Sequence, residues 1–282
     1  MTGWNGKSGY WRWQDMQGIN WAEDSFLTDT GLVKQGFSCR GGGVSHAPCD
    51  TLNIGYTWDD HEAVKENRRL LATAAGIPLE RWSCLRQVHG TKIRIVTEKD
   101  AGRGIMEPVV ELPVADGQVT NIPGVVLVTL HADCIPIYII DTKNMAIGLG
   151  HAGWKGTMAD MAGALVAGMK AAFGSEPADM LASIGPGAGG CHYEVDEPVL
   201  AKVWERFGSR PDDMGAIIKP AAEPGKAYLD LGMANAILLS EMGIPEDRIS
   251  LSGMCTIHEE VFFSHREGDR GRQAAFLALS RG

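Results

Sequence analysis

The sequence lacks the long apolar runs and the excess of positive charge that mark two large classes of protein. Its longest apolar run, residues 135–140, is far shorter than the roughly 20 residues of a membrane-spanning helix. No basic and apolar leader opens the chain, so we expect neither secretion nor a membrane partner. The net charge of −9 argues against a nucleic-acid partner, because nonspecific nucleic-acid binding needs a basic surface.

Closely spaced cysteines are also missing. No two of the six cysteines lie closer than ten residues, which excludes a Cys-x-x-Cys redox pair and a zinc ribbon. Secreted disulfide scaffolds are usually shorter and much denser in cysteine. We therefore predict a cytoplasmic protein in which most thiols serve only packing. The cysteines are Cys39, Cys49, Cys84, Cys134, Cys191 and Cys255.

Hydrophobic patterning predicts a mixture of strands and helices. The expected strands cover residues 33–38, 86–89, 93–96, 125–130, 135–140, 145–149, 180–184 and 274–279, and the expected helices cover 60–75, 157–173, 197–207 and 231–242. Continuous apolar strands suit a sheet that is covered on both faces. The predicted fold class is α/β: a single mixed α/β domain with a largely buried central sheet flanked by helices.

The two ends of the chain differ in character. Residues 1–30 hold four of the eight tryptophans without a clear period, and we expect an N-terminal extension, packed on the body or partly disordered. Residues 31–282 show the regular pattern and are expected to form the catalytic domain. Within it, residues 98–113 are rich in charge, glycine and proline and predict a loop.

Three segments place metal-binding side chains at the ends of predicted strands, where α/β sheets position ligands. They contribute His89, Cys134 and His151. Two imidazoles and one thiolate can bind Zn²⁺ and leave a fourth tetrahedral position open, as catalytic zinc requires. The alternative is that the histidines are hydrogen-bonded core or surface groups and that Cys134 is a small buried apolar residue.

Several common functional motifs are absent or incomplete. Residues 185–190 match G-x-G-x-x-G formally, but Pro186 and the residues after the loop are poor openings for the crossover helix of a dinucleotide site. The loop can still line a site with its amides. H-E-x-x-H, G-x-S-x-G and a Walker loop are absent, which removes the common hydrolase and kinase interpretations.

A series of short segments in a fixed order resembles the laccase-domain (YfiH-like) family of purine nucleoside phosphorylases, formerly described as polyphenol oxidases. The resemblance covers roughly residues 33–281 and rests on segments 37–45, 52–55, 67–68, 87–90, 115–121, 132–134, 151–154, 184–186, 193–195, 255–256, 262–264 and 271–272. It implies an α/β fold and a metal site formed by His89, Cys134 and His151. The activity it implies is phosphorolysis of adenosine, inosine, guanosine or methylthioadenosine, with adenosine deamination in some members.

The sequence departs from the family pattern at several positions. His131 replaces a usual threonine, Lys155 a common arginine and His265 a common tyrosine, while Cys39 and residues 187–190 are atypical. These departures make the preferred nucleoside less predictable than the metal site.

The implied chemistry assigns roles to residues around the metal. Asp133 is expected to act as general acid or base, or alternatively to orient a loop or ligand, and Cys134 to bind the metal as a thiolate. Arg40 and Lys155, with the amides of residues 41–43, are expected to bind phosphate. Asn53 and Arg68 complete the expected substrate contacts, although an arginine on a helix, such as Arg68, is more often a surface or salt-bridged residue. The expected partners are purine nucleosides and phosphate, and the expected state is a monomer or homodimer.

Three other functions remain open. Two histidines and a cysteine also suit Cu²⁺, but a blue-copper centre needs a weak axial donor such as methionine, and no methionine follows the ligands closely; a polyphenol oxidase is therefore an alternative. A second alternative is a metal-free cysteine hydrolase in which His89 or His151 activates Cys134. The third is a protein of cell-wall precursor quality control, a role associated with some relatives.

Overall fold

Three apolar stretches near the middle of the chain form buried strands. The computed structural model describes residues 4–105 and 112–280. In it β8 (Val126–His131), β9 (Ile135–Asp141) and β10 (Ala146–Ala152) are almost entirely buried, which explains why their sequences are continuously apolar rather than alternating. β9 and β10 pair antiparallel in one sheet, whereas β8 belongs to another.

Two large sheets contain most of the described strands. The seven-stranded sheet has the order β1 (Lys7–Ser8), β15 (Ile249–Leu251), β11 (Met180–Ile184), β9, β10, β7 (Gly117–Thr120), β6 (Ile93–Ile95). The six-stranded sheet has the order β2 (Trp11–Met16), β3 (Ile19–Asp24), β4 (Val33–Ser38), β16 (Gln273–Leu279), β8, β5 (Trp82–Ser83). A small third sheet has the order β12 (Glu194–Val195), β14 (Ala227–Leu229), β13 (Ile218–Pro220).

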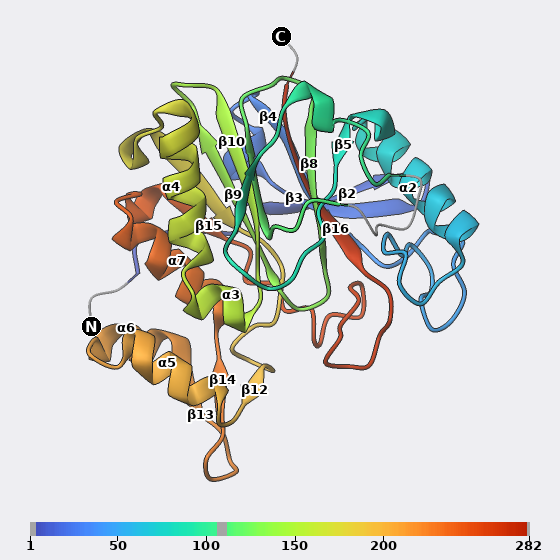
Figure 1. Cartoon of the computed structure of the whole chain (residues 1–282). Helices are drawn as coiled ribbons and strands as arrows, with labels where there is room; N and C mark the ends of the chain where they lie inside the picture. Colours follow the sequence, from blue (N-terminus) through green and yellow to red (C-terminus); the bar gives the residue numbers. More distant parts are fainter. Residues whose placement is uncertain (1–3, 106–111, 281–282) are drawn as a thin grey trace.

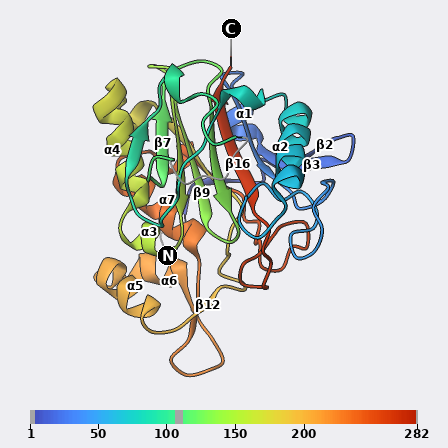
Figure 2. The same ribbon diagram turned by 45° about the vertical axis from the view of Figure 1, so that its right-hand side comes forward.

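Helices cover the outer faces of the two large sheets. The α-helices are α1 (Ser25–Thr28), α2 (His61–Ala75), α3 (Trp154–Met158), α4 (Met161–Phe173), α5 (Val199–Phe207), α6 (Pro211–Ile217) and α7 (Leu231–Glu241). The 3₁₀ turns are η1 (Leu79–Arg81), η2 (Glu98–Asp100), η3 (Pro177–Asp179) and η4 (Glu246–Arg248). Figures 1 and 2 show α4 and α7 on one side of the sheets and α2 on the other.

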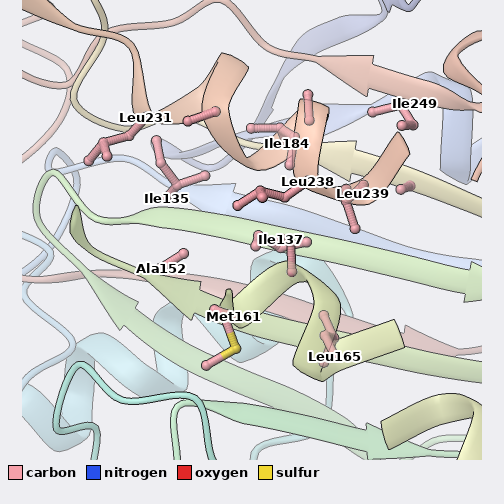
Figure 3. Packing of buried hydrophobic residues seen from close by; sticks show 14 of the residues in the cluster. Ile135, Ile137, Ala152, Met161, Leu165, Ile184, Leu231, Leu238, Leu239 and Ile249 are labelled. Atoms are coloured by element: carbon pink, nitrogen blue, oxygen red, sulfur yellow. The ribbon is translucent and has the colours of Figure 1, made fainter. Parts of the chain in front are cut away.

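Alternation along the strands sends side chains into three separate cores. Ile137 of β9 joins α4 and α7 in the first core, and Figure 3 shows it among Leu238, Met161 and Leu165. The next residue of β9, Tyr138, points to the opposite face and joins the second core, between the two sheets. The third core lies between the six-stranded sheet and α2. The mixed α/β class is confirmed, with two packed sheets where the sequence suggested one central sheet.

Glycine lets α4 approach the seven-stranded sheet closely. A Cβ atom on Gly148 of β10 would lie 3.0 Å from Met169 Sδ and 3.2 Å from Leu165 Cδ1. Both side chains are fully buried on α4. A side chain at position 148 would therefore require Met169 and Leu165 to shift by a few tenths of an ångström.

Several predicted elements are confirmed, but one helix and one strand differ. Strands at 33–38 and 180–184 have the predicted bounds, and α2 begins after the N-cap Asp60. The helix predicted at 157–173 is wrong at its start. Asp160 adopts a left-handed conformation (φ +68°) and caps α4 through the backbone N–H of Gly163, so α3 and α4 are separate helices.

The first 30 residues contribute strands to both large sheets. β1 pairs with β15 of the seven-stranded sheet, while β2 and β3 extend the six-stranded sheet beyond β4. Residues 106–111 of the predicted loop lie outside the described residues. In the part of the chain that the structure covers, no helix is long and apolar enough to cross a membrane.

Two isoleucines give a matched test of the first core. Ile137 is fully buried on β9, whereas Ile95 on β6 is 54% exposed. Ile137→Ala should lower the free energy of unfolding by about 2–5 kcal/mol, because it leaves a cavity. Ile95→Ala should lower it by only about 0.5 kcal/mol. Equilibrium urea unfolding measures both, and equal losses would contradict this account of the core.

Candidate active site

The pairing of β9 with β10 brings Cys134 and His151 together. Pro136 lies opposite His151 and Ile135 opposite Ala152, so Cys134, which directly precedes β9, lies at the same end of the ladder. His89 approaches from the loop between β5 and β6. The ligand atoms of His89, Cys134 and His151 all lie within 4.8 Å of one another. The structure thus brings together the three residues predicted to hold the metal.

The carboxylate of Asp116 shapes the loop that carries His89. The backbone N–H groups of Val88, His89 and Gly90 all donate to it, at 2.8–3.1 Å. His89 adopts a positive φ of +61° as the chain turns around the carboxylate. The predicted strand at residues 86–89 is therefore wrong: within it, only Arg86 forms an isolated bridge.

The same carboxylate orients His151. Asp116 Oδ1 lies 3.0 Å from His151 Nδ1, and because a carboxylate accepts, Nδ1 must carry the proton. Nε2 is then the nitrogen left for a metal, an arrangement common among metal-binding histidines. Burial would raise the pKa of Asp116, but the hydrogen bonds from His151 and the loop amides lower it overall. Asp116 was missed as a site residue, although it stands in one of the motif segments.

The thiol of Cys134 ionises easily in this setting. Burial would raise its pKa, but the charge of His151 and hydrogen bonds with His151 and His89 outweigh burial and lower the pKa to about 6. In turn, burial would lower the pKa of His151, but Cys134 and Asp116 raise it to about 9. The thiolate is the form that binds metals and also the nucleophilic form.

His131 lies beside the predicted ligands but is already engaged. Its Nδ1 is 2.9 Å from the carbonyl of Cys134 and its Nε2 is 2.8 Å from Thr129 Oγ1. A carbonyl can only accept, so Nδ1 donates to it and Nε2 accepts from the hydroxyl. Burial lowers the pKa of His131 well below its usual value, so the ring stays neutral. This departure from the family pattern thus supports the Cys134 backbone instead of adding a ligand.

A glycine makes room for the cluster. A Cβ atom on Gly153 would lie 2.8 Å from Cys134 Sγ and 3.1 Å from His89 Cδ2. The close approach of these two side chains therefore depends on the absence of a side chain at position 153. The donor set, with two imidazoles and one thiolate, fits Zn²⁺ with an open fourth position.

The three residues line a cavity of about 1030 Å³. Asp133, Arg68 and Lys155, three of the residues expected to act on or bind the substrate, also line it. Among the described residues of the lining, neither Arg40 nor Asn53 is found, and no methionine that could serve as an axial copper ligand. The structure thus gathers three of the five non-ligand residues that the sequence suggested.

Asp133 connects the cavity to two distant segments. It adopts a positive φ of +81°. Its Oδ1 accepts from Thr256 Oγ1 and its Oδ2 accepts from the backbone N–H of Arg266, both at 2.8 Å. These contacts fit the alternative that Asp133 orients a loop. Because Asp133 also lines the cavity, a role in proton transfer is compatible with its position.

Arg68 is buried rather than exposed on the helix surface. Its guanidinium donates to the carbonyls of Ile54, Gly104 and Ile105 and stacks over the Tyr56 ring, 4.5 Å from the ring centre. Only 2% of the residue is exposed. The side chain is therefore held rigidly at the cavity wall.

Arg40 and Asn53 serve other parts of the chain. Arg40 pairs with Asp50 and Asp269 and lines a second cavity of about 450 Å³. Asn53 is fully buried, and both atoms of its amide bond with other groups, among them the backbone of Gly55 and the carboxylate of Asp59. The structure therefore does not bring either residue to the first cavity.

Three cations that the sequence did not suggest also line the cavity: Arg86, Arg266 and Arg272. Arg266 stacks over the Tyr193 ring, 4.9 Å from the ring centre, and Arg272 lines the same cavity. Arg272 stands in a motif segment, which was an available signal. Arg266 had no such signal, because its place depends on the bond of its backbone to Asp133.

A family model described as multi-copper polyphenol oxidoreductase laccase matches residues 34–280. The chain belongs to this family. The resemblance that the motif segments suggested is confirmed, and the match spans nearly all of the described strands and helices.

The similar proteins include named relatives and solved structures. Purine nucleoside phosphorylase YlmD of Geobacillus stearothermophilus is 39% identical over 246 residues, which cover 86% of this chain and 88% of the relative. Purine nucleoside phosphorylase YlmD of Bacillus subtilis is 35% identical over 251 residues, 88% of each chain. The crystal structure of the hypothetical protein YfiH of Bacillus licheniformis superimposes with a TM-score of 0.86 at 32% identity, covering 96% of this chain and 99% of that one.

Gly153 provides a test of the cluster. Gly153→Ala should weaken zinc binding about 10- to 100-fold, because the new methyl group displaces Cys134 and His89. Gly156→Ala is the matched control, since a Cβ there meets nothing closer than 3.4 Å. Competition with a chromophoric chelator measures both affinities. Unchanged binding by Gly153→Ala would contradict the proposed ligand set.

The ionisation of Cys134 gives a second test. In metal-free, reduced protein, alkylation of Cys134 by iodoacetamide should reach half its maximal rate near pH 6 and fall as the pH drops through that value, because only the thiolate reacts. Burial and the neighbouring Cys255 raise the pKa of Cys191 to about 11, so this exposed thiol should react only at much higher pH. Peptide mass spectrometry separates the two sites. A midpoint for Cys134 near that of a free thiol, about 8.5, would contradict the geometry.

Proposed function

We propose that this chain is a metal-dependent purine nucleoside phosphorylase acting on adenosine, inosine, guanosine or methylthioadenosine. The observation that carries the proposal is the cluster of His89, Cys134 and His151 in a cation-lined cavity. The two YlmD relatives that cover most of the chain are named purine nucleoside phosphorylases. The cavity, at about 1030 Å³, is large enough for a nucleoside and a phosphate ion.

Phosphorolysis needs a bound anion close to the sugar. A phosphate oxygen forms a bond to ribose C1′ while the C1′–N9 bond breaks. The electron pair of the broken C1′–N9 bond leaves with the purine, which takes up a proton. Lys155, Arg266 and Arg272 line the cavity and supply positive charge for phosphate in a protein whose net charge is −9. Lys155 is exposed and stands at the start of α3.

His89, Cys134 and His151 would hold Zn²⁺. When bound at such an open site, zinc polarises an oxygen ligand and lowers the pKa of bound water to about 7. Asp116 fixes the His151 tautomer and the His89 loop for this purpose. Adenosine deamination, which needs an activated water, is the additional activity that this ligand set would support.

We assign Asp133 to the proton that the departing purine takes up. Its carboxyl group lines the cavity, and its two bonds to Thr256 and Arg266 hold it in place. A general acid so positioned contributes typically 10²- to 10⁴-fold to the rate. Tyr193, beneath the Arg266 guanidinium, offers an aromatic face near the same wall.

A metal-free cysteine hydrolase is the second candidate. The observation that favours it is the lowered pKa of Cys134 beside His151, which is the pairing that activates a cysteine nucleophile. The same three side chains serve both candidates, so the requirement for metal distinguishes them.

Product analysis tests the proposal directly. Zinc-loaded protein should convert inosine to hypoxanthine and ribose 1-phosphate only when phosphate is present, and removal of the metal should abolish turnover. Inosine formed from adenosine without phosphate would reveal deamination. No turnover of any purine nucleoside by metal-loaded protein would refute the function. Activity that survives metal removal but not alkylation would favour the cysteine hydrolase.

A pair of lysines tests the phosphate site in the same assay. Lys155→Met should raise the KM for phosphate about tenfold, because a charge-assisted contact is lost. Lys143→Met is the control, since Lys143 pairs with Asp179 on a turn outside the cavity lining. Equal changes in the KM for phosphate in the two variants would show that Lys155 does not bind phosphate.

A further inference from the structure

A second group of cysteines and histidines lies outside the candidate active site. It consists of Cys191 and His192, which follow the glycine-rich loop 185–190, and of Cys255 and His258, which follow β15. One ligand atom from each of these residues lies within 4.8 Å of the others. We call these four residues the second Cys/His cluster.

The backbone brings the two halves of this cluster together. Cys191 and His258 are 67 residues apart in the sequence. Gly187 forms an isolated β-bridge with Cys255, and the Gly187 carbonyl accepts from the backbone N–H of Thr256 at 3.0 Å. Hydrogen bonds of the main chain therefore hold the two segments that carry the four donors side by side.

The side chains converge on one point. Cys191 Sγ lies 3.9 Å from His258 Nδ1, and the rings of His192 and His258 are 4.4 Å apart between centres. A Cβ atom on Gly189 would be 3.4 Å from both Cys191 Sγ and Cys255 Sγ, so the two sulfurs lie on the same side of the loop. The backbone N–H of Gly189 donates to Cys255 Sγ at 3.3 Å, which fixes the position of this sulfur against the loop.

The donor set has the composition of a closed zinc site. Two thiolates and two imidazoles form the Cys₂His₂ set of structural zinc, which leaves no open position. With Zn–S bonds of about 2.3 Å in a tetrahedron, two sulfur ligands are about 3.8 Å apart. With Zn–N bonds of about 2.0 Å, two nitrogen ligands are about 3.3 Å apart. The donor atoms therefore need to close by about 1.5 Å at most, a movement within reach of side chains of which three are exposed.

We propose that Cys191, His192, Cys255 and His258 bind one Zn²⁺ as a structural site. The ion would fasten the loop 185–190 to the turn at 255–258. Both segments support Asp133: the backbone N–H of Ala188 donates to its carbonyl at 2.7 Å, and Thr256 donates to its carboxylate at 2.8 Å. The second site would thus stiffen one wall of the active-site cavity without contacting substrate. Cys191 and Cys255 then serve more than the packing role expected from their spacing.

Zinc stoichiometry tests this proposal independently of catalysis. Full-length protein, reduced, stripped of metal and reloaded with Zn²⁺, should retain two ions per chain by elemental mass spectrometry. Cys191→Ser/His258→Ala and Cys134→Ala should each retain one ion, and the triple variant none. His46→Ala, at an exposed histidine outside both clusters, is the control and should retain two.

A cobalt spectrum gives a second measurement that does not require the cluster variants to fold. Co²⁺ added to Cys134→Ala protein should give the visible absorption of a tetrahedral cobalt–thiolate centre. One zinc per wild-type chain, lost with Cys134→Ala, together with no such absorption in that variant, would overturn the proposal. A second outcome would also overturn the proposal: Cys191 and Cys255 form a disulfide, and after its reduction the cluster takes up neither zinc nor cobalt.

Discussion

The buried carboxylate of Asp116 is the interaction on which the candidate active site depends. It accepts three backbone N–H groups from the loop of His89 and a hydrogen bond from His151, while its own carbonyl accepts from the His151 backbone N–H. One side chain thus sets the position of one ligand, the tautomer of another and the path of the loop between them. A buried carboxylate with so many donors stays ionised, and an ionised group in a core keeps its partners in place because losing any of them leaves charge unpaired.

The two-sheet architecture places the Asp116 carboxylate beside the ligands of the candidate active site. β9 and β10 are buried on both faces, by α4 and α7 on one side and by the six-stranded sheet on the other. His151 stands on β10 and Cys134 directly precedes β9, while His89, Asp133 and Arg266 come from loops that hydrogen bonds hold in place. The strand β10 fixes His151, and the hydrogen bonds of Asp116 and Asp133 fix the loops that line the cavity.

Much of the fold was predictable because its signals are local. The strand at 33–38 and the helix capped by Asp60 follow from apolar periodicity and capping chemistry, which act over a few residues. The break at Asp160 and the turn at His89 were missed because both backbones adopt a positive φ, and at His89 the turn is imposed by a carboxylate 27 residues away. No local pattern carries that information.

The sequence alone determined the mixed α/β class, the family through its ordered motif segments, and His89, Cys134 and His151 as candidates for one site. Only the tertiary structure decided which polar residues share a cavity: it placed Arg68 at the wall and Arg40 elsewhere. It also brought Cys191 beside His258, a neighbour that no spacing rule suggested. The physical reason is that local propensities act over a few residues, whereas a site is assembled by pairing and packing between segments far apart in the chain.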